Sequence, residues 1–417
     1  MKRKVYLLTL ASLMLLTAGT MVTSCSKGDD GETEEPMDFD LEKGYNSYSF
    51  SDMDGADGGG PTGTGGNTQA GVVTAGEWND LDNWAYWSRL MLSEDYGEKS
   101  DYWSCFTNNR IPVEVVDGSN KPLAGAHVKL VRMIGSPEPL WEAVTDNHGR
   151  ANLWLGLWQK DENPDLSLLR VSIDGKMMDG EPKAYTWESA LQEVVNRYTV
   201  TPFSSIVKQQ ADIAFVVDAT GSMFDEIDFL KSDLLDILNK VESLRPTQTF
   251  RTAALFYRDR GDDYLTRHSD FTTSKSTTVD FVSEQEAGGG GDYPEAVHTA
   301  LEQTLKSLSW DEQARTRLAF LILDAPAHHE ADVIASLQQS IESCARQGIR
   351  LIPVAASGTD KNTEFMLRFF SVVTGGTYVF LTDDSGVGGS HMAPTVGDYD
   401  VELLNSLIIR LIDHYTE

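Results

Sequence analysis

Two hydrophobic patterns follow one another along the chain. Between residues 110 and 175, apolar positions such as Ile111, Val113 and Val115 alternate with polar ones, which is typical of half-buried β-strands. Beyond Lys208 the strand-like runs are continuously apolar and alternate with segments whose apolar residues fall on one helical face. Such alternation predicts a parallel sheet covered by helices on both faces. We therefore expect an α/β fold, a doubly wound parallel-sheet domain preceded by a small β-sandwich.

The elements of the second half can be placed from these patterns. The predicted strands are Ile213 to Val217, Thr252 to Tyr257, Leu318 to Leu323, Ile349 to Ala355 and Tyr378 to Leu381. The first and last predicted helices carry their apolar faces at Ile227 to Val241 and at Leu404 to Ile412. In open sheets of this kind, ligands bind at the carboxyl ends of the strands.

The N-terminus has the pattern of an export signal. Lys2, Arg3 and Lys4 precede an apolar run that is shorter than the ~20 residues a membrane span needs. The run is followed by Val22-Thr23-Ser24-Cys25, which resembles the lipobox of bacterial lipoproteins, in which the cysteine becomes lipidated. The alternative is an ordinary signal peptide that contains a cysteine. The resemblance implies a lipid anchor at Cys25, and the acidic run after it resembles a surface-export tag or is a solvated spacer.

Composition shifts give the expected boundaries. We expect a signal peptide over 1–24, a flexible acidic and Gly-rich tether over 25–70, an aromatic helical segment over 71–109, the sandwich over 110–182, a linker helix over 183–205 and an independently folding domain over 206–417. The tryptophans of the aromatic segment fit a packed helix face better than an exposed carbohydrate platform.

Charge and cysteine content narrow the function classes. The chain has 64 acidic and 34 basic residues and a net charge of -30, which excludes nucleic acid as a partner. After Cys25 only Cys105 and Cys344 remain, and we expect both to be core or free thiols rather than a disulfide framework.

Oxygen-bearing side chains follow the predicted strands. Asp218, Thr220 and Ser222 come directly after the first strand, and Asp324 follows the third. A glycine run and Asp292 lie in a loop between them. Oxygen ligands suit Mg²⁺, Mn²⁺ or Ca²⁺, so the sequence predicts a divalent metal site at this edge of the sheet.

These loops resemble those of the von Willebrand factor A domain. The family's metal-ion-dependent adhesion site pairs Asp-x-Ser/Thr-x-Ser with a Thr in a second loop and an Asp in a third, which corresponds to Asp218, Thr220, Ser222 and Asp324. The second loop departs from the pattern, since it offers glycines and Asp292 in place of the Thr, and whether Asp292 binds the ion stays open. The alternative is a domain without metal, in which Asp218 only caps the following helix.

A second resemblance concerns the sandwich. Pro122 to Leu130 and Thr145 to Ala151 are similar to carboxypeptidase-regulatory-like or Cna-B-like modules, which usually act as spacers, so no chemistry is assigned to them. The segments Tyr257 to Asp263 and His328 to Glu330 are interpreted as a charged hairpin turn and a solvent-facing loop.

The resemblance implies a binding module, with Mg²⁺ as the expected ion and a carboxylate from a partner protein as its last ligand. The expected location is the cell surface of an outer membrane, anchored at Cys25.

One alternative to a binding function is a metal-dependent hydrolase or phosphatase with Asp218 as nucleophile, although Thr220 and Ala219 stand where such enzymes need an acid or a lysine. Another is a structural subunit of an envelope assembly. We expect no enzymatic activity.

Overall fold

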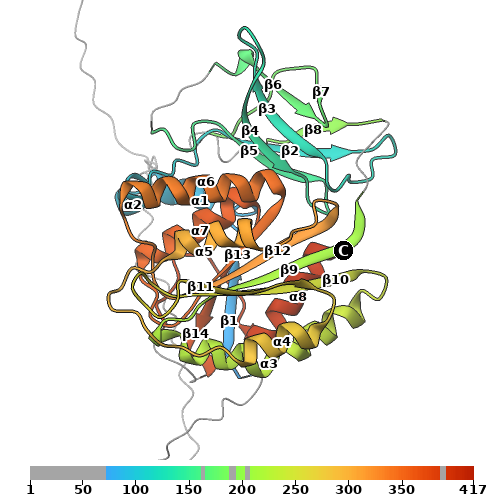
Figure 1. Cartoon of the computed structure of the whole chain (residues 1–417). Coiled ribbons are helices and arrows are strands. Elements are labelled where there is room, and N and C mark those ends of the chain that lie inside the picture. Colours follow the sequence, from blue (N-terminus) through green and yellow to red (C-terminus); the bar gives the residue numbers. More distant parts are fainter. Residues whose placement is uncertain (1–71, 161–164, 187–193, 202–206, 386–390) are drawn as a thin grey trace, which may run out of the picture. The chain divides into compact units, whose positions relative to one another are not determined.

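The computed structural model describes residues 72–160, 165–186, 194–201, 207–385 and 391–417 (Figure 1). The predicted signal peptide, the predicted lipidation site Cys25 and the predicted tether lie outside the described residues, as do 187–193 and 202–205 of the predicted linker helix. No helix in the described part of the chain is both long enough and apolar enough to span a bilayer.

An eight-stranded, mostly parallel sheet forms the larger part of the fold. Its strand order is β11-β10-β9-β12-β13-β14-β1-β15. The five central strands are parallel and are the ones expected from the sequence: β9 (Lys208–Asp218), β10 (Thr249–Tyr257), β12 (Ala314–Leu323), β13 (Ile349–Ala355) and β14 (Tyr378–Thr382). Antiparallel strands complete the sheet: β11 (Thr266–Thr272) at one edge, and β1 (Thr74–Trp78) and β15 (Glu402–Leu403) at the other.

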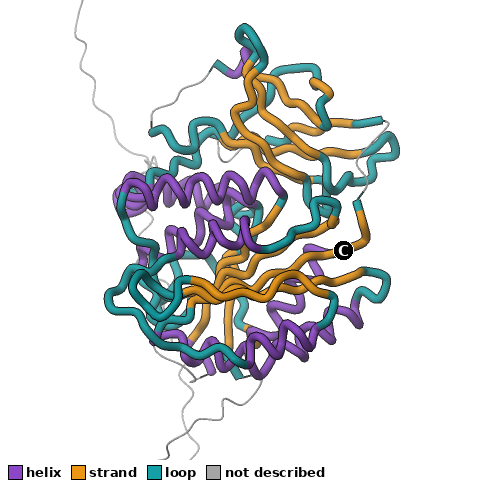
Figure 2. Tube along the Cα trace, viewed as in Figure 1, coloured by secondary structure: helices purple, strands orange, loops and turns teal. Residues whose placement is uncertain are grey.

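Helices cover both faces of this sheet (Figure 2). One face carries α3 (Phe224–Leu244), α4 (Lys275–Ser283) and α8 (Leu404–Thr416), and the other carries α5 (Val297–Ser307), α6 (Ala331–Gln347) and α7 (Lys361–Thr374). Strand β9 shows why its sequence is continuously apolar. Phe215 belongs to the core under α3, whereas its neighbours Ala214 and Val216 belong to the opposite core. The predicted doubly wound fold is confirmed.

The aromatic segment packs onto the same sheet. It forms β1, α1 (Trp84–Met91) and α2 (Glu94–Trp103). Trp87 and Trp103 are 0% and 1% exposed, so the packing interpretation is confirmed and the exposed platform is excluded. Strand β1 pairs with β14 along its whole length, from Thr74 opposite Thr382 to Trp78 opposite Tyr378. The sequence suggested that the large sheet is confined to residues 206–417. This is wrong, because β1 belongs to the sheet and lies about 300 residues before its partner β14 in the chain.

A buried ion pair fixes this segment to the sheet domain. Arg368 on α7 is fully buried and donates to both carboxylate oxygens of Asp80, at 2.9 and 2.6 Å. It also donates to the hydroxyl of Tyr96 and to the carbonyl of Thr395. Burial alone lowers the pKa of Arg368, but the charge and hydrogen bonds of Asp80 more than reverse this, so the net shift is upward.

The sandwich consists of two sheets. The strands of one are β5 (Arg150–Trp154), β2 (Arg110–Val116) and β8 (Asn196–Thr199); those of the other are β4 (Glu138–Val144), β3 (His127–Arg132), β6 (Leu169–Ile173) and β7 (Lys176–Met177). The Thr145 to Ala151 motif is a tight turn in which Asp146 accepts hydrogen bonds from the backbone N–H groups of His148 and Arg150. Gly149 has φ of 73°, and a Cβ there would lie 2.4 Å from the Val115 carbonyl, so only glycine fits.

The predicted linker helix is wrong for the residues at its C-terminal end that the structure describes. Asn196–Thr199, which was expected to end a helix, is strand β8 and pairs in parallel with β2. The Asn196 amide donates to the carbonyls of Pro112 and Lys183, so its side chain holds the strand against the sandwich. This pairing depends on a distant strand and leaves no local trace in the sequence.

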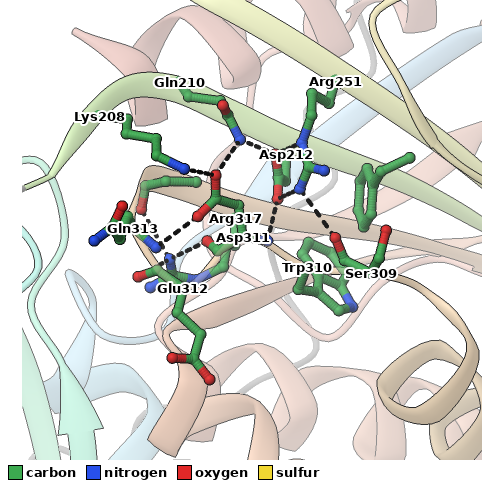
Figure 3. Close-up of polar contacts among 12 residues, drawn as sticks. Lys208, Gln210, Asp212, Arg251, Ser309, Trp310, Asp311, Glu312, Gln313 and Arg317 are labelled. Atoms are coloured by element: carbon green, nitrogen blue, oxygen red, sulfur yellow. Dashed lines mark hydrogen bonds and ion pairs between the residues drawn. The ribbon is translucent and has the colours of Figure 1, made fainter.

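A polar network joins the amino ends of β9, β10 and β12 (Figure 3). Asp212 is fully buried and accepts two hydrogen bonds from Arg251, at 2.8 and 2.5 Å, and one from the Asp311 backbone. Lys208 pairs with the Asp311 side chain. The network fixes the relative register of three strands at the edge opposite to the predicted metal site. Short 3₁₀ turns complete the described elements at Leu166–Leu168, Gly221–Met223 and Asp383–Ser385.

Candidate metal centre

Of the predicted site residues at the end of β9, Asp218 and Thr220 are buried and Ser222 is exposed. Asp218 is the last residue of β9 and is 0% exposed, and Thr220 is 1% exposed. One carboxylate oxygen of Asp218, Oδ1, accepts hydrogen bonds from the backbone N–H and the hydroxyl of Thr220, both at 2.8 Å. The other oxygen, Oδ2, is buried without a hydrogen bond of good geometry, although the hydroxyl of Tyr257 lies close enough to lower the pKa of Asp218. Asp218 therefore aims one unpaired acceptor into the edge of the sheet.

The loop after β12 meets the same point. Asp324 is buried, and its Oδ1 atom also lacks a hydrogen-bond partner. Burial raises the pKa of Asp324, and a hydrogen bond from the side chain of Ser222 opposes that rise. Four of the predicted residues are thus brought together: Asp218, Thr220, Ser222 and Asp324.

The second loop differs from the sequence expectation. Asp292 is exposed and makes no hydrogen bond or ion pair among the described residues. Glu295, three residues later, is 4% exposed and its Oε2 atom is buried without a partner. The backbone N–H of Glu295 donates to the carbonyl of Pro326 at 2.9 Å, which fixes it beside the loop of Asp324. Glu295 is the acidic residue that sequence analysis missed, and its place directly before the first apolar turn of α5 is the signal that could have found it.

The glycine run allows this close approach. A Cβ on Gly290 would lie 3.2 Å from Oε1 of Glu295 and 3.3 Å from Cβ of Thr220. Gly290 has φ of 73°, a conformation that favours glycine, and a side chain there would be tightly packed. The glycine loop consequently lies against Thr220, and Glu295 at its end lies beside the predicted metal ligands.

The predicted hairpin turn after β10 and the predicted solvent-facing loop after β12 meet in this region. Asp259 is 5% exposed and contacts Nε2 of His328 at 2.8 Å. Asp262 accepts hydrogen bonds from the backbone N–H groups of Asp259 and Gly290. The hairpin interpretation is confirmed, since this segment joins the antiparallel strands β10 and β11, but it did not include the contact with the loop after β12. His329 is exposed, as expected, and stacks on Tyr102.

The carboxylates strongly disfavour each other's charge. Burial, and then the charge of Asp324, raise the pKa of Asp218 to about 7 against the opposing hydrogen bonds of Thr220. Burial, followed by the charges of Asp218 and Asp259, raises the pKa of Glu295 to about 9. Three buried acceptor oxygens without donors, on mutually repelling acids, fit a bound cation. The ligand atoms of Asp218, Glu295 and Asp324 are not all within 4.8 Å of one another, so the three do not all contact one ion directly in this geometry.

Other polar sites lie away from this edge. The imidazoles of His148 and His414 and the carboxylate of Glu417 have ligand atoms within 4.8 Å of one another, but they are mostly exposed. A cavity of about 550 Å³ is lined by residues that include Arg110, Tyr185 and Arg350. None of the predicted site residues lines it.

The raised pKa values predict a pH dependence of the metal-free protein. The folded state holds protons on Asp218 and Glu295 at pH values where the unfolded chain, with ordinary pKa values of 3.8 and 4.5, has lost them. Stability should therefore fall as pH rises from about 4 through about 7, and further towards about 9. Urea unfolding in chelator at several pH values measures this effect. Asp218→Asn should make the loss of stability with rising pH smaller, because only Glu295 then contributes. Asp236→Asn, on the exposed face of α3, should leave the pH dependence unchanged. Equal pH dependence in the wild type and both variants would contradict the role of Asp218.

Comparison with known proteins identifies the domain that carries this site. The sequence pattern of the von Willebrand factor A domain matches residues 212–364, from β9 into α7. Residues 212–364 are a von Willebrand factor A domain. The match confirms the resemblance and includes the loops of Asp218, Glu295 and Asp324. In the structure, the sheet of this A domain also takes in β1, β14 and β15, which lie outside the matched residues.

The relatives share only part of their length with this chain. The alpha-protein kinase vwkA of Dictyostelium discoideum is 37% identical over 119 residues, which are 28% of this chain and 19% of the kinase. The putative ariadne-like RING finger protein R811 of Acanthamoeba polyphaga mimivirus is 30% identical over 132 residues, or 32% of this chain and 13% of that protein. The chain therefore spans less than a fifth of either relative. Among solved structures, the pilus adhesin SpaC of Lactobacillus rhamnosus GG matches at a TM-score of 0.35 and 10% identity over 51% of this chain and 31% of the adhesin, a likeness too distant to support an argument.

Proposed function

We propose that the A domain is a binding module that engages a partner protein through a divalent ion, Mg²⁺ first among the candidates and Mn²⁺ or Ca²⁺ after it. The observation that supports this is the set of three buried carboxylates, each with an oxygen that has no donor. Asp218, Thr220, Ser222 and Asp324 would hold the ion, with Glu295 beside them. The bound ion would supply a positive charge that relieves their repulsion and orders the loops that face a partner.

An enzymatic role is not part of the proposal. A phosphatase with Asp218 as nucleophile would need an anionic substrate to approach a site that already contains Glu295 and Asp324. One oxygen of Asp218 is also occupied by two hydrogen bonds from Thr220. A structural role in an envelope assembly is compatible with binding, because the sandwich then acts as a spacer.

We place the protein, as a further part of this proposal, at the outer membrane with a lipid anchor on Cys25 and the A domain exposed at the cell surface. The acidic composition and the N-terminal signal pattern support this location. Protease treatment of intact cells, compared with cells that express Cys25→Ser, tests it, since only an anchored and exposed A domain is both membrane-bound and cleaved.

The metal response of the purified protein tests the function. An ion that binds only the folded state adds ~2.7 kcal/mol of stability at a hundredfold excess over its dissociation constant. Mg²⁺ or Mn²⁺ should therefore raise the melting temperature of residues 26–417, and Asp218→Ala should abolish the rise. Partner capture from an envelope extract should require the ion and should be lost in Asp218→Ala.

Asp236→Ala is the matched control, because Asp236 lies on α3 with an exposed ion pair to Lys240. It should leave both the metal response and capture unchanged. Melting that is indifferent to every divalent ion would exclude the metal site. Metal-dependent release of phosphate from phosphorylated substrates that disappears in Asp218→Ala would instead support the hydrolase.

A further inference from the structure

The charge at the metal site bears on which partner it can accept. Asp218, Glu295 and Asp324 contribute three negative charges when ionised, and a divalent ion contributes two positive ones, so the loaded site keeps a charge of about -1. In the adhesive A domains that the sequence resembles, the second loop supplies a neutral Thr and the partner supplies a carboxylate. Here the chain itself places a carboxylate at that loop.

We propose that Glu295 takes the place of the partner's carboxylate in neutralising the ion, so that the loaded edge of the A domain selects a basic protein surface, rich in Lys and Arg, instead of an acidic one. The inference rests on the proposed metal-dependent binding. It replaces the sequence-based expectation of a partner carboxylate with the opposite charge.

The backbone holds Glu295 in place independently of any ligand. Its N–H bonds to Pro326, and the residue forms a β-bridge with Ala327, so it moves with the loop of Asp324. The glycine loop lies close to its carboxylate, since a Cβ on Gly290 would be 3.2 Å from Oε1 of Glu295. A buried carboxylate fixed at this position must be protonated or neutralised by a cation. The ion therefore meets an internal carboxylate before any partner arrives.

The exposed rim of the site is acidic as well. Exposed carboxylates lie on four loops at the carboxyl edge of the sheet: Asp263 after β10, Asp292 before α5, Asp360 after β13 and Asp384 after β14. Asp263 and Asp292 make no hydrogen bond or ion pair within the described ranges. These charges remain free to act on a partner.

The cations of the same loops are already engaged. Arg258 donates to the carbonyls of Ala219 and Glu286. Arg260 pairs with Glu330, and Lys361 pairs with Glu364. An acidic partner would therefore meet a net negative charge at the loaded site and on the rim, whereas a basic partner would meet complementary charge, which steers association and sets specificity.

The test compares a soluble chain of residues 26–417 with its variants Glu295→Gln, Glu295→Thr and the control Glu312→Gln. Glu312 is an exposed acid before β12, at the opposite edge of the sheet. Titration calorimetry with Mg²⁺, Mn²⁺ and Ca²⁺ measures ion affinity, and circular dichroism checks that each variant folds. Binding of a ten-lysine peptide and of a ten-glutamate peptide to the metal-loaded proteins is then measured at 0.15 M salt, where the Debye length is ~8 Å.

We expect Glu295→Gln to weaken ion binding at least about tenfold, because the buried negative charge of Glu295 beside the ligands attracts the cation. Loaded wild type should bind the lysine peptide and not the glutamate peptide. Glu295→Thr should gain binding of the glutamate peptide, and Glu312→Gln should behave as wild type.

The outcomes separate the two proposals. Wild type that binds no divalent ion overturns the proposed function and this inference with it. If wild type binds the ion no more tightly than Glu295→Gln does, the inference alone is overturned. The same holds if wild type binds the glutamate peptide as well as Glu295→Thr does.

Discussion

Replacing Asp80 by alanine is expected to lower the free energy of unfolding by about 3–5 kcal/mol, the effect typical of removing one partner of a buried ion pair. The reason is that Arg368 and Asp80 are 0% and 2% exposed and share two hydrogen bonds. Without Asp80 the guanidinium stays buried beside Trp87 and keeps only Glu364, 3.7 Å away, as a nearby carboxylate. Urea unfolding followed by tryptophan fluorescence measures the loss.

Two further variants sharpen this experiment. Asp82→Ala removes an exposed acid two residues away and should change stability by no more than ~0.5 kcal/mol. The double variant Asp80→Leu with Arg368→Met removes both charges and should recover most of the loss, because apolar replacements of buried pairs are often neutral or stabilising. If Asp80→Ala were as stable as Asp82→Ala, the pair would not hold the aromatic segment to the A domain.

A chain that begins at residue 206 is expected not to fold, whereas one that begins at residue 72 should unfold cooperatively. The shorter chain lacks β1, which lies between β14 and β15 in the sheet. Its loss uncovers Tyr378 and Phe380 of β14, which are 1% and 3% exposed in the structure. It also leaves Arg368 buried without Asp80.

The expected loss of stability is large enough to prevent the chain that begins at residue 206 from folding. Each large side chain that returns to water forfeits ~1.5–3 kcal/mol, and the orphaned guanidinium adds ~3–5 kcal/mol. Together they approach the ~5–15 kcal/mol net stability of a whole domain. Circular dichroism and urea unfolding of both chains measure this. A cooperative transition of the chain from residue 206, at a midpoint like that of the longer chain, would restore the boundary that the sequence suggested.

Local patterns in the sequence determine most of the A-domain framework. Each parallel strand is a continuous apolar run and each helix has one apolar face, and these signals lie within the element itself. The same holds for Asp218, Thr220, Ser222 and Asp324. They directly follow the strands whose carboxyl ends meet at one edge, so strand order along the chain was enough to bring them together.

The tertiary structure alone decided which acid completes the site. Asp292 and Glu295 are both acidic and lie in one loop, and the place of Glu295 before the first turn of α5 only hints that it is the one that faces the site. Glu295 faces the site because Gly290 lets the loop pack on Thr220 and because Pro326 accepts its backbone hydrogen bond. The contact between Asp259 and His328 is likewise made by loops 69 residues apart.

Strand β1 shows the same limit on a larger scale. The hydrophobic pattern of its five residues, Thr74–Trp78, is too short to predict a strand. These residues form a strand because they pair with β14, about 300 residues away in the chain. The buried pair of Asp80 and Arg368 spans 288 residues. Hydrophobic periodicity specifies what an element is, but the choice of its neighbours depends on burial and charge neutralisation that arise only when the whole chain has folded.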